Sequence, residues 1–155
     1  MAKVFVAYDS KYGNTKLAAE NVLAGIKESG ENEVGIGYVK EVDFGSLICY
    51  DAIVLGAPNH MGRPSRTMKN FVDRLASFDL KAKQVAVFGT YSGKIRVEDR
   101  AVKKMEKVIQ EKMRGITLIK PTLSVRVGGV SGPVVEGELA KCVDIGRRIA
   151  GQLKS

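Results

Sequence analysis

Hydroxyl, amide and glycine residues are concentrated in one short segment near the start of the chain, Ser10–Thr15, which reads SKYGNT. The segment follows the apolar run VFVA and precedes an amphipathic pattern, so we expect it to join a strand to a helix. The first N–H groups of a helix have no intrahelical partner, and the helix dipole makes their surroundings positive. Gly13 would let a ligand approach the backbone closely, and the hydroxyl groups could donate to it. The pattern therefore predicts an anion site at this junction.

Two further segments follow apolar runs and could contribute to the same site. They are residues 56–64, which read GAPNHMGRP, and residues 89–94, which read GTYSGK. We interpret both as loops that follow strands. In parallel α/β sheets, ligands bind beyond the carboxyl ends of the strands, where the strand order reverses. Both loops are therefore expected to lie beside the segment Ser10–Thr15.

The elements that must position these loops alternate regularly along the chain. We expect strands at 3–8, 33–39, 52–55, 84–88 and within 116–127, and helices at 14–29, 43–49, around 68–75, around 102–113 and at 139–153. Continuous apolar strands that alternate with helices predict an α/β fold: a doubly wound, five-stranded parallel sheet with helices on both faces. A length of 155 residues suits a single domain, 1–155.

Composition narrows the possible functions. No stretch reaches membrane-spanning length, the start shows no signal-peptide pattern, and Cys49 and Cys142 lack metal or redox spacing, so we expect a cytoplasmic protein. One histidine excludes a histidine-rich metal site. The formal net charge of +8 favours acidic protein partners, whereas nucleic acid and membranes are not expected partners. In the segment 102–114, lysine and glutamate alternate as on a solvated helix face.

Other phosphate-binding motifs fit the chain poorly. The dinucleotide pattern G-x-G-x-x-G is absent, because Lys40 stands where the third glycine would follow Gly35 and Gly37. The segment 89–94 is one residue too short for a Walker loop, and Ile95 replaces its Ser or Thr. A response regulator would need an acidic pair after the first strand and a carboxylate at position 57, which is Ala57.

The segment Ser10–Thr15 resembles the phosphate loop of the flavodoxin family, although Tyr12 replaces the usual small Thr or Ser. The resemblance extends over most of the chain, and GAP and FGTYSG are also similar to the flavodoxin modules of diiron flavoproteins. It implies a flavodoxin-like fold that binds FMN without a covalent bond. The cofactor-binding residues that it implies are Ser10, Lys11, Tyr12, Gly13, Asn14, Thr15, Pro58, Asn59, His60, Met61, Gly62, Thr90, Tyr91, Ser92 and Gly93.

The resemblance also implies roles for single residues of the two later loops. Met61 would lie against one flavin face, and Gly62 would supply a peptide that turns over on reduction. Residues 90–93 would bind the pyrimidine edge of the ring through the backbone. The chain has no Trp, so Tyr91 either stacks on the ring or leaves one face open. His60, Arg63 and Arg66 make the loop basic, whereas electron carriers of the family are commonly acidic there.

We interpret the chain as an FMN-binding electron carrier that shuttles electrons between redox partner proteins, as a monomer or homodimer. No catalytic acid, base or nucleophile is evident, because the cofactor carries the redox chemistry. An FMN-dependent NAD(P)H:quinone oxidoreductase shares this fold and phosphate loop and is the main alternative. Such enzymes are usually longer, with insertions that this chain lacks. An interaction domain without flavin is the third hypothesis, and a yellow purified protein would exclude it.

Overall fold

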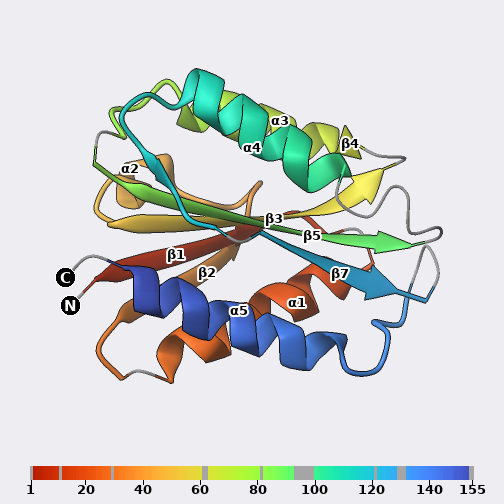
Figure 1. Ribbon diagram of the computed structural model, residues 1–155. Coiled ribbons are helices and arrows are strands. Elements are labelled where there is room, and N and C mark those ends of the chain that lie inside the picture. Colours follow the sequence, from red (N-terminus) through yellow and green to blue (C-terminus); the bar gives the residue numbers. More distant parts are fainter. Residues whose placement is uncertain are drawn as a thin grey trace.

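The computed structural model describes residues 2–10, 12–28, 30–60, 63–80, 82–92, 100–120, 122–128 and 132–153 (Figure 1). For residues 59, 60, 63 and 64 it describes the backbone only. The elements in chain order are β1 (Lys3–Tyr8), α1 (Asn14–Lys27), β2 (Glu33–Tyr38), α2 (Phe44–Leu47), β3 (Ala52–His60), β4 (Arg63–Pro64), α3 (Arg66–Leu75), β5 (Gln84–Ser92), α4 (Arg100–Lys112), β6 (Thr117–Leu118), β7 (Leu123–Val127) and α5 (Glu138–Gln152).

A parallel sheet with the strand order β2-β1-β3-β5 forms the centre of the molecule. Its last position is shared by β6, which pairs with the start of β5, and β7, which pairs with its end. The chain first moves outward from β1 to β2 and then returns to β3 on the other side of β1, so the order reverses there. The predicted five-stranded parallel sheet is confirmed, with the antiparallel β4 added beside β3.

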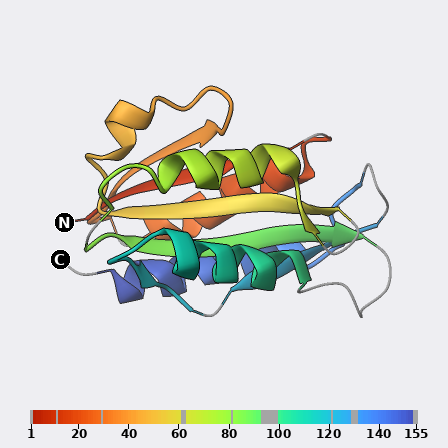
Figure 2. The ribbon, with the colours of Figure 1, turned by 90° about the horizontal axis from the view of Figure 1, so that it is seen from above.

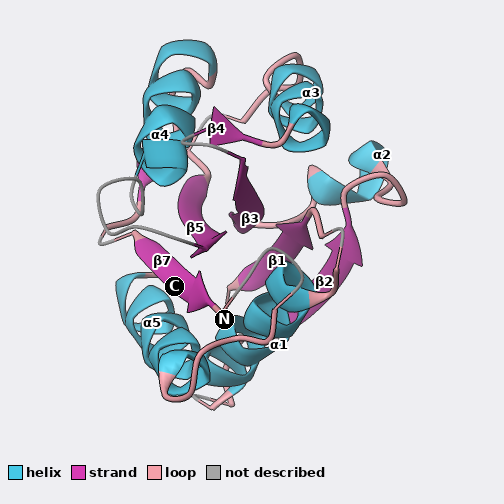
Figure 3. Cartoon of the chain, turned by 90° about the vertical axis from the view of Figure 1, so that its right-hand side faces the viewer, coloured by secondary structure: helices cyan, strands magenta, loops and turns pink. Residues whose placement is uncertain are grey.

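Helices cover both faces of the sheet, as predicted. In Figure 1, α3 and α4 lie above the sheet and α1 and α5 below it, and Figure 3 shows the two layers end-on. Each layer encloses its own apolar cluster, because successive side chains of a strand point to opposite faces. On β1, Val4 and Val6 face α1 and α5, whereas Ala7 faces α3.

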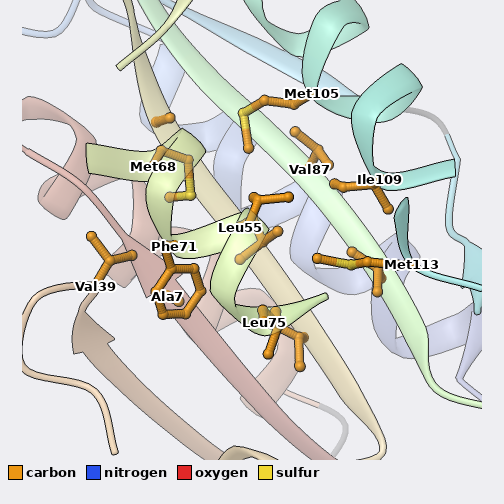
Figure 4. Packing of buried hydrophobic residues seen from close by; sticks show 14 of the residues in the cluster. Ala7, Val39, Leu55, Met68, Phe71, Leu75, Val87, Met105, Ile109 and Met113 are labelled. Atoms are coloured by element: carbon orange, nitrogen blue, oxygen red, sulfur yellow. The ribbon is translucent and has the colours of Figure 1, made fainter. Parts of the chain in front are cut away.

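The upper cluster packs α3 and α4 against the sheet through apolar side chains. Leu55 and Val87 from the sheet pack with Met68 of α3 and with Met105 and Ile109 of α4 (Figure 4). All five side chains are at most 3% exposed. Fully burying a side chain of this size contributes about 1.5–3 kcal/mol, so this layer fixes both helices firmly on the sheet.

Two glycines set the close crossing of the lower helices. A Cβ atom on Gly146 of α5 would lie 2.1 Å from the backbone oxygen of Val22, and one on Gly25 of α1 would lie 2.0 Å from that of Val143. No side chain fits between backbones at this distance. Ile145 beside Gly146 is also buried, so this side of α5 packs closely on the rest of the molecule.

The interpretation of 56–64 and 89–94 as loops is wrong for most of these residues. β3 continues to His60 and forms a hairpin with β4, and β5 continues to Ser92. The pairing of β1 with β3 ends at Gly56, so the later part of β3 has a parallel strand on one side only, where Pro58 faces Thr90. Proline is tolerated at such an edge, although it normally signals a loop.

The start of β1 and the end of α5 lie at the same edge of the sheet, the edge where β1 and β3 begin (Figures 1 and 2). The last helix is joined to this edge by Gln84 of β5, whose side-chain amide donates to the carbonyl oxygen of Gln152 at 3.0 Å. The segments that follow the strands are therefore at the opposite edge. None of the helices in the described part of the chain is long and apolar enough to cross a membrane.

Candidate functional site

The N-terminus of α1 is built as the sequence predicts. Gly13 is the N-cap with φ +89°, a left-handed conformation that favours glycine. The Ser10 hydroxyl accepts a hydrogen bond from the Gly13 N–H at 3.0 Å and so closes the turn that precedes the helix. The carbonyl oxygen of Gly13 then accepts the first intrahelical bond, from the Leu17 N–H at 3.0 Å. The N–H groups of residues 14–16 precede that bond and point out of the helix end.

This helix end is suited to an anion. In the described residues no side chain caps it and its first turn has no acidic residue, although a capping oxygen would normally stabilise such an end. The exposed Lys16 adds a cation beside it. A Cβ atom on Gly13 would have no other atom within 4 Å, so the space over the turn is open. Backbone donors, hydroxyl groups and this open space fit a phosphate dianion.

Thr15 joins the first of the predicted segments to the third. Its Oγ1 lies 2.8 Å from the Oγ1 of Thr90 on β5, and the two side chains are 2% and 4% exposed. Either hydroxyl can be the donor. Because a hydroxyl has one hydrogen and two lone pairs, Thr15 can accept from Thr90 and still donate to a ligand. The pair therefore connects the α1 N-terminus to the end of β5 through side chains.

A buried carboxylate joins the first segment to the second. Asp9 is 8% exposed, its N–H donates to the Gly56 carbonyl oxygen at 2.9 Å, and its Oδ2 accepts a hydrogen bond from the Ser65 hydroxyl. Ser65 is itself the N-cap of α3 and accepts from the Met68 N–H at 3.1 Å. Neither residue was among the expected site residues; the available signal was a serine one residue before an amphipathic helix.

A fourth segment, which the sequence did not indicate, also reaches the site. A Cβ atom on Gly132 would lie 2.5 Å from the Oδ1 of Asn14, so the backbone before α5 packs against the first residue of α1. Gly132 has φ +104° and is followed by Pro133. The Gly-Pro pair predicts a turn but says nothing about what the turn contacts.

A hollow of about 330 Å³ adjoins the α1 N-terminus on the β2 side. Ser10, Gly13 and Lys16 form one wall, and Tyr8, Tyr38 and Glu41 complete the lining. The tyrosine rings lie 6.1 Å apart, so the end of β1 meets the end of β2 through aromatic side chains. The hollow begins at the anion site and lies away from β5, where the ring edge is expected.

The structure brings together most of the predicted site residues that it describes. Ser10, Gly13, Asn14 and Thr15 surround the start of α1, Thr90 contacts Thr15, and Pro58 pairs with Thr90 in the sheet. Tyr12 is 50% exposed, and the ends of β3 and β5 carry Asn59, His60 and Ser92. Lys11, Met61, Gly62 and Gly93 lie outside the described residues.

Tyr91 has a clear position in the fold. Its side chain is 8% exposed, and it points to the face of the sheet opposite Thr90, because neighbouring side chains of a strand alternate. Thr90 faces α1, so the Tyr91 side chain points to the other face of the sheet, the one on which α3 and α4 lie.

Titratable groups around the site stabilise the scaffold. Burial raises the pKa of Glu138, but hydrogen bonds from Lys141 and from the Arg126 N–H outweigh burial and hold the pKa below its ordinary value of 4.5. Glu138 thereby ties the start of α5 to β7. Burial raises the pKa of the Cys142 thiol to about 12, so this thiol is unreactive. Among the described residues no cluster of His, Cys, Asp and Glu could hold a metal ion.

Comparison with known proteins assigns the chain to a family. A flavodoxin of Aquifex aeolicus (strain VF5) is 38% identical over 73 residues, which are 47% of this chain and 40% of that protein. An NAD(P)H dehydrogenase (quinone) of Methylocella silvestris is 35% identical over 94 residues, which are 48% of this chain and 47% of that protein. The chain thus spans about half the length of these curated relatives.

The whole chain is similar to a solved structure. Oxidised flavodoxin 1 of Bacillus cereus superposes with a TM-score of 0.81 at 25% identity, covering 99% of this chain and 100% of that one. The family model described as Flavodoxin matches residues 6–144, which include the anion site and all or part of every strand of the main sheet. The chain belongs to the flavodoxin family, whose members bind FMN.

Proposed function

We propose that this chain binds FMN without a covalent bond and carries electrons between redox partner proteins. The observation that carries the proposal is the uncapped N-terminus of α1, with open space over Gly13 and hydroxyl groups beside it. FMN differs from riboflavin by a phosphate, and that phosphate is the anion that the helix end suits. When bound, FMN supplies the redox chemistry, and the protein binds and orients it.

The residues proposed to hold FMN fall into two groups. Ser10, Lys11, Tyr12, Gly13, Asn14 and Thr15 would bind the phosphate through N–H and hydroxyl groups. Pro58, Asn59, His60, Met61, Gly62, Thr90, Tyr91, Ser92 and Gly93 would surround the ring, mainly through the backbone at the ends of β3 and β5. The contact between Thr15 and Thr90 holds the two groups in fixed relation, so that phosphate and ring are oriented together.

The phosphate assignment can be tested at Gly13 with a matched control. Gly13→Ala forces a left-handed conformation on a residue with a Cβ atom, and we expect FMN to bind more weakly while riboflavin binding stays the same. Gly30→Ala is the control, because Gly30 has φ +72° and a Cβ atom there would also have no other atom within 4 Å, but it lies after α1. Equal loss of both ligands in Gly13→Ala, or the same loss in Gly30→Ala, would contradict the assignment.

The electron carrier is the function that the family and the whole-length structural likeness support. An FMN-dependent NAD(P)H:quinone oxidoreductase is the second candidate, and the partial similarity to the Methylocella protein favours it. Anaerobic titration with NADPH separates the two functions. Bleaching of bound FMN by NADPH without any added reductase supports the enzyme, and unbleached FMN supports the carrier.

We further propose that the redox partners are acidic at the contact surface and that the protein works in the cytoplasm. The formal net charge of +8 supports acidic partners. The cytoplasmic location is supported by Cys49 and Cys142, which are both free. A partner rate that falls as salt is added is the expected result, because salt screens the attraction between opposite charges.

A further inference from the structure

The two helical layers of the molecule differ in how their charges are paired. On α1 and α5, cations alternate with anions and form ion pairs: Arg147 with Glu28, Arg148 with Asp144, and Lys141 with Glu138. Among the described residues of α3 and α4, one ion pair joins the helices, between Lys112 and Asp73. That pair lies near the C-terminal ends of both helices, far from the site.

The N-terminal halves of α3 and α4 carry exposed cations that form no ion pair with any described residue. These residues are Arg66 and Lys69 on α3 and Arg100, Lys103, Lys104 and Lys107 on α4, and we call them the α3–α4 basic surface. Glu106 is the one anion in this half of α4, and it faces Lys120 at 3.7 Å with its side chain 13% exposed. The alternation of lysine and glutamate read from the sequence is therefore absent from this part of the helix surface.

Helix physics does not explain this arrangement. Arg100, Lys103, Lys104 and Lys107 follow i, i+3, i+4 and i+7 spacing, so they share one face and repel each other. Cations in the first turn of a helix are also unfavourable, because the helix dipole is already positive there. Glu98 and Asp99 precede α4 in the sequence and lie outside the described residues. Charges that lower stability and have no ion-pair partner among the described residues are expected where they bind something else.

The α3–α4 basic surface lies at the same edge of the sheet as the proposed FMN site. α3 begins directly after the β3–β4 hairpin and α4 follows β5, so both helix N-termini lie at the edge where the strands end (Figure 3). That edge holds the residues proposed to bind FMN. A partner seated on these N-terminal halves would come close to the cofactor, whereas one seated near Asp73 and Lys112 would not.

We propose that the α3–α4 basic surface is the docking site for a carboxylate-rich redox protein. This inference rests on the proposed electron transfer and adds which face of the molecule is used. Nucleic acid fits the surface less well, because the large exposed apolar side chains of the described residues, Tyr12, Leu17 and Ile48, lie elsewhere and offer no stacking platform there. The same absence of exposed apolar side chains argues against a membrane surface.

The first test measures binding without electron transfer. A fluorescent ten-residue poly-glutamate peptide is titrated with the FMN-loaded full chain and followed by anisotropy. In the test variant, Lys104→Glu is combined with Lys107→Glu. In the control variant, Lys27→Glu at the C-terminal end of α1 is combined with Arg114→Glu just after the C-terminal end of α4. Each substitution changes the charge by two, so both double variants have a formal net charge of +4 instead of +8.

If the α3–α4 basic surface is the docking site, the test and control variants must differ in their affinity for the peptide. We expect the test variant to bind the peptide at least about ten-fold more weakly than the parent, and the control variant to stay within about two-fold. Equal weakening of both variants would mean that net charge alone attracts the peptide and would overturn the proposal, as would no weakening in either. A thymidine decanucleotide that binds more tightly than the peptide and loses affinity in the test variant would replace the protein partner by nucleic acid.

A second measurement separates docking from the proposed function. The FMN-loaded chain is reduced chemically and mixed, in separate reactions, with succinylated cytochrome c, which is acidic, and with native cytochrome c, which is basic and otherwise equivalent. We expect faster reduction of the acidic acceptor and a loss of that preference in the test variant only. If the chain binds the peptide through the basic surface but reduces neither acceptor, the proposed electron transfer is wrong and the docking site stands. A chain that reduces both acceptors equally in all variants contradicts the docking site alone.

Discussion

The hydroxyl pair of Thr15 and Thr90 offers a test in which stability and ligand binding respond differently. Thr15→Val and Thr90→Val each replace a hydroxyl with a methyl group of similar size and leave the other hydroxyl without this partner at a site at most 4% exposed. An unsatisfied buried hydroxyl costs about 1–3 kcal/mol. For a chain of 155 residues that corresponds to a melting temperature lower by roughly 2–12 °C, at 2–4 °C for each kcal/mol.

The double variant Thr15→Val with Thr90→Val should recover most of this loss. Replacing both partners with apolar groups of the same shape leaves no polar group unsatisfied and is nearly neutral. We therefore expect the double variant to be more stable than either single variant, with a coupling free energy of at least about 1 kcal/mol. Thermal and urea unfolding of the ligand-free chain, followed by circular dichroism, measure all four proteins.

Ligand binding should not recover in the double variant. It folds with parent-like stability but has no hydroxyl at position 15 to donate to a phosphate, so FMN should bind more weakly while riboflavin binding is nearly unchanged. Fluorescence titrations with both flavins give the comparison. If the double variant were no more stable than the weaker single variant, the hydroxyl pair would not be the stabilising contact. If FMN and riboflavin lost affinity equally, Thr15 would have no part in binding phosphate.

Three further predictions concern the scaffold around the site. Gly146→Ala should lower the free energy of unfolding by about 1–3 kcal/mol or more, because its Cβ atom would lie 2.1 Å from the Val22 oxygen. Gly151→Ala on the same helix has open space and should be neutral or stabilising. Urea unfolding measures both variants. Glu138 has a lowered pKa in the folded chain, so its contribution to stability is full above its ordinary pKa of 4.5 and is lost as the pH falls below that value. Glu138→Gln should therefore flatten this acidic part of the stability–pH curve measured by thermal melting. Lys103→Glu should raise the free energy of unfolding by about 0.5–1.5 kcal/mol, because it places an anion near the start of α4 and one turn before Lys107. Lys112→Glu should lower the free energy of unfolding, because it breaks the ion pair with Asp73. A destabilised Lys103→Glu chain in urea unfolding would remove the argument that these cations are unfavourable for the helix.

The sequence predicts those parts of the fold that depend on local pattern. Apolar runs located the strands, and 3.6-residue spacing located the helices, because burial on one or both faces imposes those patterns. The extension of β3 and β5 was missed because Gly56, Pro58 and Asn59 have low strand propensity. Pairing with β5 holds Gly56 and Pro58 extended, and pairing with Pro64 of β4 holds Asn59 extended. The strand from Gln84 was likewise expected to end at Phe88, four residues too early.

The candidate site was predictable where its residues are close in the sequence. Ser10, Gly13 and Thr15 act through one helix end, and their types and order indicate an anion without knowledge of the fold. The contacts of Asp9 with Ser65 and of Thr15 with Thr90 join residues 56 and 75 positions apart. No local pattern encodes such a contact, so the side chains that hold the three segments together became visible only in the structure.

The neighbouring start of β1 and end of α5 determine how this protein could be immobilised. The start of β1 and the end of α5 lie at the edge where β1 and β3 begin (Figure 1), and Cys49, which is exposed and free, precedes β3 at the same edge. A gold surface that captures this thiol, or a tag on either end, would therefore hold the molecule upright with its proposed cofactor edge toward the solution. Such a layer would exchange electrons poorly with the metal below it but would leave the α3–α4 basic surface open to partners above. An electrode designed for direct exchange would instead need a thiol introduced at the opposite edge.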